Sequence, residues 1–497
     1  MIWVIEHRWP GGAASILLAG LSGVLLVIIF PAAGVAVLAP VALVPLLTAL
    51  AAEPRPRRRF LLGWVSGCLF WAGSCYWIYE VLRVHGRMPA AGAGVLFAGF
   101  FLVKGLHLGV FAWLAAPLLR RSWAIPAVAA LWVAVEGTHP YLGFTWLVLG
   151  NAATSMAAVA RLAPITGVAG LSFALAAMNV AVTLALLRRP KTHLAWIAAL
   201  LLLFLLPGLP GPAPGAHAAN LVQTRLLDEE IQAAPWTPAR TAKLLEEMGA
   251  LSTAGSPELI VWPENPAPLY FYHDPLFRTH VETIARRARA HLLVGTVAYR
   301  DEAGRQPLNS AVLVAPDGTE VARYDKIHLV PFGEFVLWPF GSLVEKITRE
   351  AGDFVPGDRV VVMRAGERKL GTFICYESAF GRAVRKFAAD GAELLVNVSN
   401  DGWFGRSAAR DQHLLIARLR AMENGRWLLR ATNTGLTAVI DPAGRVTAAL
   451  PPDRPGVLAA RFDYSERRTA YTRAGDWFWW LTLAAAGAAK IGERISP

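Results

Sequence analysis

The sequence predicts two parts of different fold class, an all-α bundle of membrane-spanning helices and an α/β domain. The chain of 497 residues is 55% hydrophobic and only 17% charged, and its mean hydropathy is +0.41, which is typical of a protein that lies in a bilayer. Long apolar stretches fill the first 210 residues, whereas short apolar runs alternate with helical stretches further along the chain. A segment rich in proline and glycine, 207–215, divides the two parts because proline cannot continue a helix.

Eight apolar stretches have the length of a membrane span. Seven precede the linker and one follows the α/β region, at about 13–30, 32–51, 60–82, 90–119, 123–148, 162–187, 193–209 and 476–489. A cleaved signal peptide is the alternative for the first stretch, but its amino end carries little positive charge and hydrophobic segments follow directly. We therefore expect an uncleaved first helix and a transmembrane bundle of about eight helices, with residues 1–210 supplying about seven of them.

Basic residues in the loops predict the orientation of the bundle. Clusters of arginine and lysine follow the second, fourth and sixth spans, at 55–59, 120–121 and 188–191. The alternate loops carry only Arg83 and Arg87, with no lysine or arginine from 137 to 160. The positive-inside rule then places both termini in the cytoplasm and the α/β domain on the other side of the membrane. Part of the net charge of +12 is explained in this way, and no DNA- or RNA-binding motif indicates a nucleic-acid partner.

The α/β domain is predicted from residue 219 to 465, and the last helix falls within 474–497. Runs of strand length stand at 220–223, 259–262, 292–298, 310–314, 321–326, 370–374, 394–398 and 436–440, and helical stretches include 275–291 and 411–424. Three of these strands run into a chemically reactive side chain, namely Glu264, Lys326 and Cys375. A strand that ends in this way presents the side chain at its tip, where it can meet a substrate.

These three side chains suit nucleophilic catalysis. A cysteine thiol needs a base that accepts its proton and a cation that favours the thiolate. Glu264 can be the base and Lys326 the cation, and Lys326 with backbone N–H groups after Cys375 can stabilise the negative charge that develops on an attacked carbonyl or nitrile. Each residue taken alone also fits a structural role, as an inert buried thiol, a strand-end carboxylate or a surface charge.

Together, the segments around these residues resemble the nitrilase, or carbon-nitrogen hydrolase, superfamily. The matching blocks are Trp262-Pro-Glu264, Tyr324-Asp-Lys326-Ile-His-Leu-Val-Pro-Phe-Gly-Glu334, Cys375-Tyr-Glu377 and Asn397-Val-Ser-Asn-Asp-Gly-Trp-Phe404. The resemblance implies a nitrilase-like α-β-β-α sandwich. It also implies that Glu264 is the base, Lys326 the catalytic lysine and Cys375 the nucleophile, with Glu334, Tyr376 and Glu377 in supporting or substrate-binding positions. Glu334 and Glu377 would hold Lys326 and fix its charge state.

The whole chain resembles the apolipoprotein N-acyltransferase family within that superfamily. Further matching blocks are Gly143-Phe-Thr-Trp146, Leu162-Ala-Pro-Ile-Thr-Gly167 and Tyr471-Thr-Arg-Ala-Gly-Asp-Trp477. Trp236 corresponds to the mobile-loop tryptophan of the family. However, Val222-Gln-Thr-Arg225 stands where a strand end containing Gly-Asn is expected, so an ordinary surface-loop aromatic is the alternative for Trp236.

This resemblance implies an enzyme of the bacterial inner membrane whose catalytic domain faces the periplasm. The enzyme would move an acyl chain from a membrane phospholipid, through a thioester on Cys375, to the α-amino group of the diacylglyceryl-cysteine of apolipoproteins, the last step of lipoprotein maturation. Its partners would be the phospholipid donor, the diacylated apolipoprotein and the bilayer, and the chain would act as a monomer. We expect no cofactor and no metal, because the sequence lacks a metal-ligand spacing of cysteine or histidine.

Two questions stay open at the level of sequence. Lys104, His107 and Glu136 fall within predicted spans, where ionisable residues are either functional or paired inside the bundle. The alternative functions are a membrane-tethered nitrilase-type amidase that hydrolyses a small amide or nitrile, and a non-catalytic scaffold. An amidase has no need of eight spans, and a scaffold has no need of the Glu, Lys and Cys set.

Overall fold

The computed structural model describes residues 12–142, 144–187, 202–211, 215–224, 237–301, 306–331, 333–335 and 354–495. The chain divides into two compact units, a helical unit made of Met1–Tyr79, Pro89–Gly208 and Asp476–Pro497, and an α/β unit made of Glu80–Met88 and Leu209–Gly475. Trp236, the basic cluster at 188–191 and most of the span predicted at 193–209 lie outside the described residues.

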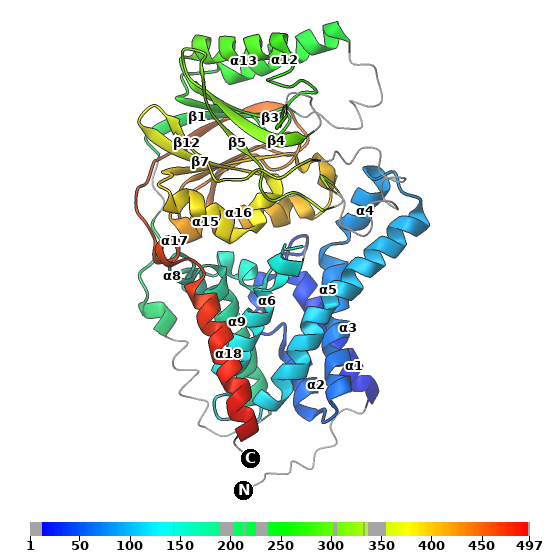
Figure 1. Cartoon of the computed structure of the whole chain (residues 1–497). Helices are drawn as coiled ribbons and strands as arrows, with labels where there is room; N and C mark the ends of the chain where they lie inside the picture. The colour runs from blue at the N-terminus through cyan, green and yellow to red at the C-terminus, as the bar shows by residue number, and fades with distance from the viewer. Residues whose placement is uncertain are drawn as a thin grey trace. The chain divides into compact units, whose positions relative to one another are not determined.

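The helical unit contains one long helix and several shorter ones (Figure 1). Its described helices are α1 (Gly12–Ile28), α2 (Val44–Ala52), α3 (Pro56–Ser74), α5 (Ala90–Leu118), α6 (Ala124–Glu136), α7 (Ala157–Ala160), α8 (Ala163–Thr166), α9 (Val168–Leu186) and α18 (Trp477–Ile495). Short 3-10 segments are η1 (Ala36–Leu38), η2 (His139–Leu142), η3 (Leu149–Ser155) and η5 (Leu202–Leu205). The helix α4 (Trp77–Val84) follows α3 after a bend of 53°.

Within the described residues, α5 and α9 are long and apolar enough to cross a membrane, and the bent pair of α3 and α4 makes up to three such helices. Three predicted spans are not continuous α-helices in the structure. The stretch at 32–51 is α-helical only from Val44, and the stretch at 60–82 is divided by the bend between α3 and α4. The stretch at 123–148 is α-helical only to Glu136 and continues in 3-10 turns and extended residues. The bundle of about eight membrane-spanning helices remains a prediction.

Glycines bring α3 and α5 into close contact. Gly63 and Gly67 on α3 pack against the part of α5 that carries Gly105 and Gly109. A Cβ atom at Gly63 would lie only 2.2 Å from the carbonyl oxygen of Leu108, and one at Gly67 would lie 2.8 Å from that of Gly105. Because the hydrophobic effect does not drive helices together inside a bilayer, such small-residue contacts, which let two backbones approach, stabilise the pair.

The non-helical stretch after α6 is held by polar side chains of the bundle. Lys104 Nζ donates to the carbonyl oxygen of Phe144 at 2.9 Å and lies 2.9 Å from His139 Nδ1. Asn151 Oδ1 accepts from the N–H of Val148 at 2.8 Å. Irregular backbone at membrane depth is stable only when its polar groups find such partners. Lys104 is therefore paired inside the bundle, as one of the two alternatives for it requires.

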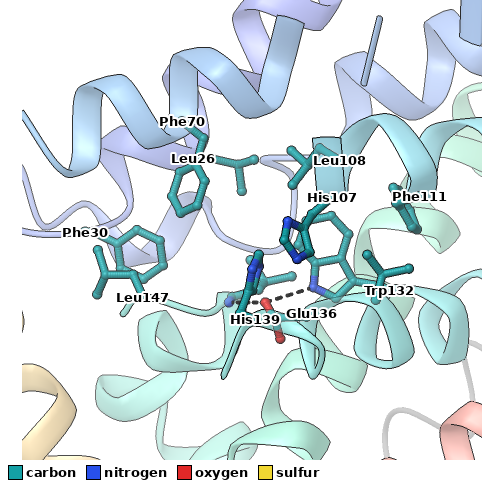
Figure 2. Close-up of a pocket in the computed structure, with 12 residues that line it drawn as sticks. Leu26, Phe30, Phe70, His107, Leu108, Phe111, Trp132, Glu136, His139 and Leu147 are labelled. Carbon is teal, nitrogen blue, oxygen red and sulfur yellow. Dashed lines mark hydrogen bonds between the residues drawn. The ribbon is translucent and has the colours of Figure 1, made fainter. Parts of the chain in front are cut away.

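Glu136 has the same role on the other side of this stretch. Its Oε1 accepts from the N–H of Leu149 at 2.6 Å and from Trp132 Nε1 at 3.2 Å (Figure 2). Figure 2 also shows His107 and His139 beside Glu136, around a cavity of about 20 Å³. This volume is enough for about one water molecule.

Within the described residues, the α/β unit contains two six-stranded sheets. The first has the order β12-β1-β2-β3-β4-β5, with β1 (His217–Gln223), β2 (Leu259–Val261), β3 (His291–Tyr299), β4 (Pro307–Val314), β5 (Glu320–Asp325) and β12 (Gly456–Phe462). The second has the order β11-β10-β9-β8-β7-β6, with β6 (Val362–Ala365), β7 (Arg368–Ile374), β8 (Leu394–Ser399), β9 (Leu428–Thr432), β10 (Ala438–Ile440) and β11 (Val446–Ala449). The central strands β1, β2 and β3 are parallel to one another, as are β7, β8 and β9.

Helices cover the outer face of each sheet (Figure 1). The first sheet carries α12 (Pro238–Ser252) and α13 (Pro275–Ala288), and the second carries α15 (Gly381–Ala389) and α16 (Ala409–Asn424). Asp274 caps the amphipathic helix α13, because its carboxylate accepts from the N–H of Phe277. The helix buries Phe277, Val281 and Ile284 in the core over the first sheet.

Each strand predicted from the apolar runs overlaps an observed one, and the predicted two-sheet α/β domain with helices outside is confirmed.

Candidate active site

The three predicted catalytic side chains lie at strand ends of both sheets. Glu264 follows β2 and Lys326 follows β5 in the first sheet, whereas Cys375 follows β7 in the second. All three are buried, with Lys326 only 1% exposed and Cys375 6%. Gly295 on β3 allows the Glu264 backbone to come close, because a Cβ atom there would lie 2.7 Å from Glu264 Cα. The structure thus places each residue where the strand pattern predicts it.

Lys326 forms ion pairs with two carboxylates. Its Nζ lies 2.8 Å from Glu334 Oε1 and 3.4 Å from Glu264 Oε1. Burial alone would lower the pKa of Lys326, but the negative charges of Glu334 and Glu264 outweigh it and raise the pKa above its ordinary value. Lys326 therefore keeps its positive charge at neutral pH, in a site where an unpaired buried ammonium would be strongly unfavourable.

Asn309 on β4 connects the two carboxylates, a role that was not predicted from the sequence. Its Nδ2 donates to Glu264 Oε1 at 2.6 Å and to Glu334 Oε1 at 2.7 Å. The backbone carbonyl oxygen of Asn309 accepts from the backbone N–H of Lys326 at 2.8 Å. The available signal was an amide side chain inside a largely apolar strand, because a buried polar group needs specific partners.

The second oxygen of each carboxylate is held by a backbone N–H. Glu264 Oε2 accepts from Asn400 at 2.6 Å, and Glu334 Oε2 accepts from Val330 at 2.8 Å. Asn400 immediately follows β8 and precedes the 3-10 turn η7 (Asp401–Phe404), so Glu264 connects the first sheet with the turn that follows the second. These bonds fix the orientation of Glu264 toward Lys326.

Glu377 binds the Tyr324 hydroxyl and backbone N–H groups, and no hydrogen bond joins it to the Lys326 ammonium. The prediction that Glu377 holds Lys326 is therefore wrong. Glu377 Oε1 accepts from Tyr324 Oη at 2.8 Å and from the N–H groups of Ile327 and His328 at 2.8 and 3.1 Å, and its Oε2 accepts from the N–H of Ile374 at 2.8 Å. Burial raises the pKa of Glu377, although these donors oppose the shift. Glu377 therefore positions the segment after Lys326 against the strand that ends at Cys375.

Cys375 opens the 3-10 turn η6 (Cys375–Ala379) in a left-handed backbone conformation, with φ of +50°. Burial raises the pKa of its thiol, and the nearby carboxylate of Glu264 raises it further, whereas Lys326 lowers it. The thiol is therefore protonated at neutral pH in the resting site. Its proton must be transferred during the reaction, and of the two carboxylates that act on the thiol, Glu264 and Asp401, Glu264 has the larger effect on its pKa. Tyr376 packs edge-on against Phe380, with ring centroids 5.2 Å apart.

Comparison with known proteins identifies both parts of the chain. The carbon-nitrogen hydrolase family matches residues 229–471, and the apolipoprotein N-acyltransferase N-terminal domain matches residues 22–181. An apolipoprotein N-acyltransferase of Geobacter metallireducens is 35% identical and covers 95% of this chain and 93% of its own length. One of Azotobacter vinelandii is 34% identical and covers 100% and 98%.

Among solved structures, an amidase of the nitrilase superfamily from Nesterenkonia AN1 is 22% identical, with a TM-score of 0.40 over 53% of this chain and 95% of the amidase chain. A carbon-nitrogen hydrolase from Helicobacter pylori G27 is also 22% identical, with a TM-score of 0.37 over 54% of this chain and 94% of its own. The two curated relatives span nearly the full length of the sequence, and on this basis the chain belongs to the apolipoprotein N-acyltransferase family.

Proposed function

We propose that this protein transfers an acyl chain from a membrane phospholipid to the α-amino group of the diacylglyceryl-cysteine of an apolipoprotein, through a thioester on Cys375. Its family is one of acyltransferases of lipoprotein biosynthesis. The observation that carries the mechanism is the buried ion-paired cluster of Glu264, Lys326 and Glu334. The charges of Glu264 and Lys326 act on the Cys375 thiol. Such a cluster supplies the base and the cation that acyl transfer through a cysteine requires.

In the first half-reaction, Glu264 accepts the thiol proton of Cys375 while the sulfur attacks the ester carbonyl of the phospholipid. The tetrahedral oxyanion is stabilised by the ammonium of Lys326 and by backbone N–H groups after Cys375. The carbon–oxygen bond to the glycerol then breaks, and the leaving oxygen takes the proton from Glu264. Lysophospholipid departs, and the acyl chain remains on sulfur as a thioester.

In the second half-reaction, the α-amino group of the apolipoprotein attacks the thioester carbonyl. Glu264 accepts the amine proton, and Lys326 again stabilises the oxyanion. The carbon–sulfur bond breaks, and the sulfur of Cys375 takes back a proton as the amide product leaves. Glu334 with Asn309 holds Lys326 in its charged form. Glu377 and Tyr376 support the turn at the nucleophile, and Trp236 contributes to substrate binding.

The architecture proposed for this activity has residues 1–210 and 474–497 as a transmembrane bundle of eight helices and residues 219–465 as the catalytic domain. The enzyme acts as a monomer in the bacterial inner membrane, with the catalytic domain in the periplasm and both termini in the cytoplasm. The basic loops at 55–59, 120–121 and 188–191 support this orientation. A bundle that reaches the substrates within the bilayer is favourable because each methylene exposed to water costs about 0.8 kcal/mol.

Substitution of the three catalytic residues tests the proposal. Full-length variants in detergent are given phospholipid and a diacylated lipopeptide, and the triacylated product is measured by mass spectrometry. We expect Cys375→Ala to form no product, and Glu264→Gln and Lys326→Ala each to lose a factor of about 100 or more. Cys68→Ala, a cysteine of α3, is the matched control and should behave as the wild type. Turnover near that of the wild type in Cys375→Ala would refute the mechanism.

A further inference from the structure

The backbone at Cys375 is hydrogen-bonded to His413, a residue outside the proposed catalytic set. A residue with a Cβ atom is unfavourable at a φ of +50°, so neighbouring contacts must maintain this conformation. The carbonyl oxygen of Cys375 accepts a hydrogen bond at 3.0 Å from Nε2 of His413 on α16. The imidazole of His413 is completely buried.

The contacts of His413 place a hydrogen on Nε2. A carbonyl oxygen can only accept, so Nε2–H is the donor to Cys375. Nδ1 lies 3.0 Å from Arg430 Nη2 and 3.1 Å from Asp401 Oδ1. Burial lowers the pKa of His413 and the charge of Arg430 lowers it further, whereas the carboxylate of Asp401 opposes the shift. Nε2–H donates to Cys375 in the neutral ring and in the charged ring alike.

Arg430 is itself fixed by a buried network. Its Nη2 donates to both carboxylate oxygens of Asp401 at 2.8 and 2.6 Å, and its Nη1 donates to Asn397 Oδ1. Asp401 also accepts from Ser399 Oγ at 2.8 Å. Each of these residues lies in β8, η7 or β9, next to the turn that holds Glu264 through the N–H of Asn400. The position of His413 is thus set by the buried hydrogen-bond network of β8, η7 and β9.

We propose that His413 is a positioning residue for Cys375. The Nε2–H of His413 orients the peptide group between Cys375 and Tyr376. The peptide is planar, so an oxygen held toward His413 fixes the direction of the Tyr376 N–H. That N–H is one of the backbone donors assigned to the oxyanion, and this inference rests on the proposed role of Cys375 as nucleophile. His413 itself touches neither substrate nor the sulfur in this role.

Three variants of the full-length enzyme distinguish the hydrogen bond from His413 to Cys375 from the space that the His413 side chain fills. In His413→Gln, the amide nitrogen is the same number of bonds from the backbone as Nε2, so the donor to Cys375 is kept. In His413→Asn, the amide nitrogen takes the place of Nδ1, and in His413→Leu the donor is absent. The measurement is the single-turnover rate of acyl-adduct formation on Cys375 with phospholipid alone, at several phospholipid concentrations.

We expect His413→Leu and His413→Asn to form the adduct roughly 10- to 100-fold more slowly at saturating phospholipid, because a buried carbonyl loses its donor. The phospholipid concentration at half-maximal rate should not change, and His413→Gln should stay within about 3-fold of the wild type. His280→Leu, a histidine of α13 in the same domain, is the matched control and should leave the rate unchanged.

Three results would each overturn the inference. The first is an equal rate in all His413 variants, and the second is an equal defect in His413→Gln and His413→Leu. The third is loss of folding in both His413→Gln and His413→Asn. The last result would show that the ring is needed only for packing. Cys375→Ala in the same assay distinguishes failure of this inference from failure of the proposed function. An adduct in Cys375→Ala would refute Cys375 as the nucleophile. If Cys375→Ala forms no adduct but the His413 variants do not follow the expected pattern, only the role of His413 is refuted.

Discussion

At the scale of residues, the site is governed by how buried charges are paired. The ammonium of Lys326 lies against one oxygen of each carboxylate, Glu334 and Glu264, and Asn309 donates to the same two oxygens. Backbone N–H groups hold the other oxygen of each carboxylate. This arrangement keeps Lys326 charged and leaves the Cys375 thiol protonated, since burial and the carboxylate of Glu264 both raise its pKa. The nucleophile is therefore activated by proton transfer at the moment of attack, not by a thiolate that exists beforehand.

The pH dependence of Cys375 alkylation follows from this raised pKa. Below the pKa of a thiol, the thiolate fraction rises tenfold for each pH unit. We expect the rate of modification by iodoacetamide, followed on the Cys375 peptide by mass spectrometry, to increase from about pH 6 to beyond about pH 9 without a plateau, whereas a free thiol levels off above its pKa of about 8.5. A plateau below about pH 8 would show a preformed thiolate and contradict the assignment.

The sequence predicted the reactive residues and the contact of Glu334 with Lys326, but not the other residues that hold the site. Glu264, Lys326 and Cys375 stand at the ends of apolar strands, and this pattern can be read from the chain alone. Asn309, His413 and Arg430 lie within strands or a helix, and their roles depend on contacts between segments that are far apart in sequence. A polar residue in an apolar strand, such as Asn309, can be noticed in the sequence, but hydropathy and spacing carry no information about its partners, so only the structure could identify these contacts.

At the scale of elements, strands were predicted better than membrane helices. Each apolar run in the α/β domain became part of a strand because its length and its flanking polar residues allow little else. In the bundle, the run at 123–148 is equally apolar, yet its helix ends at Glu136. Lys104, Glu136 and Asn151 provide hydrogen bonds that replace those of a helix. A hydropathy profile counts these residues only as polar and so could not predict the break.

The contact between α3 and α5 gives a prediction with an internal control. In Gly63→Ala, the new methyl group would meet the carbonyl oxygen of Leu108 at 2.2 Å, so the helices must separate, and the variant should lose about 1–3 kcal/mol of stability. Gly94→Ala on α5 meets nothing within 4 Å, and the higher helix propensity of alanine should leave stability unchanged or raise it by up to about 1 kcal/mol. Thermal melting of the detergent-solubilised proteins measures both. Equal melting of the two variants would show that the packing at Gly63 does not stabilise the bundle.

At the scale of the whole molecule, the chain joins a helical unit to an α/β unit that carries all the described site residues. The family has lipid substrates, so the side of the membrane on which the α/β unit lies decides which substrates it meets. Single cysteines introduced on the exposed face of α13, for example at Arg287, should react with a membrane-impermeant maleimide in intact spheroplasts. Cysteines at Arg57 should react only after the membrane is permeabilised. The reverse pattern would invert the proposed topology.

The most direct test of the central claim is the mass of the intact protein after incubation with phospholipid alone. A single nucleophile that serves two lipid substrates in turn must form its thioester before the acceptor binds. We predict one long-chain acyl adduct per protein, located on Cys375, with release of an equal amount of lysophospholipid, and discharge of that adduct as an amide when a diacylated lipopeptide is added. Steady release of free fatty acid without an adduct, or an adduct that persists when the lipopeptide is added, would contradict the account.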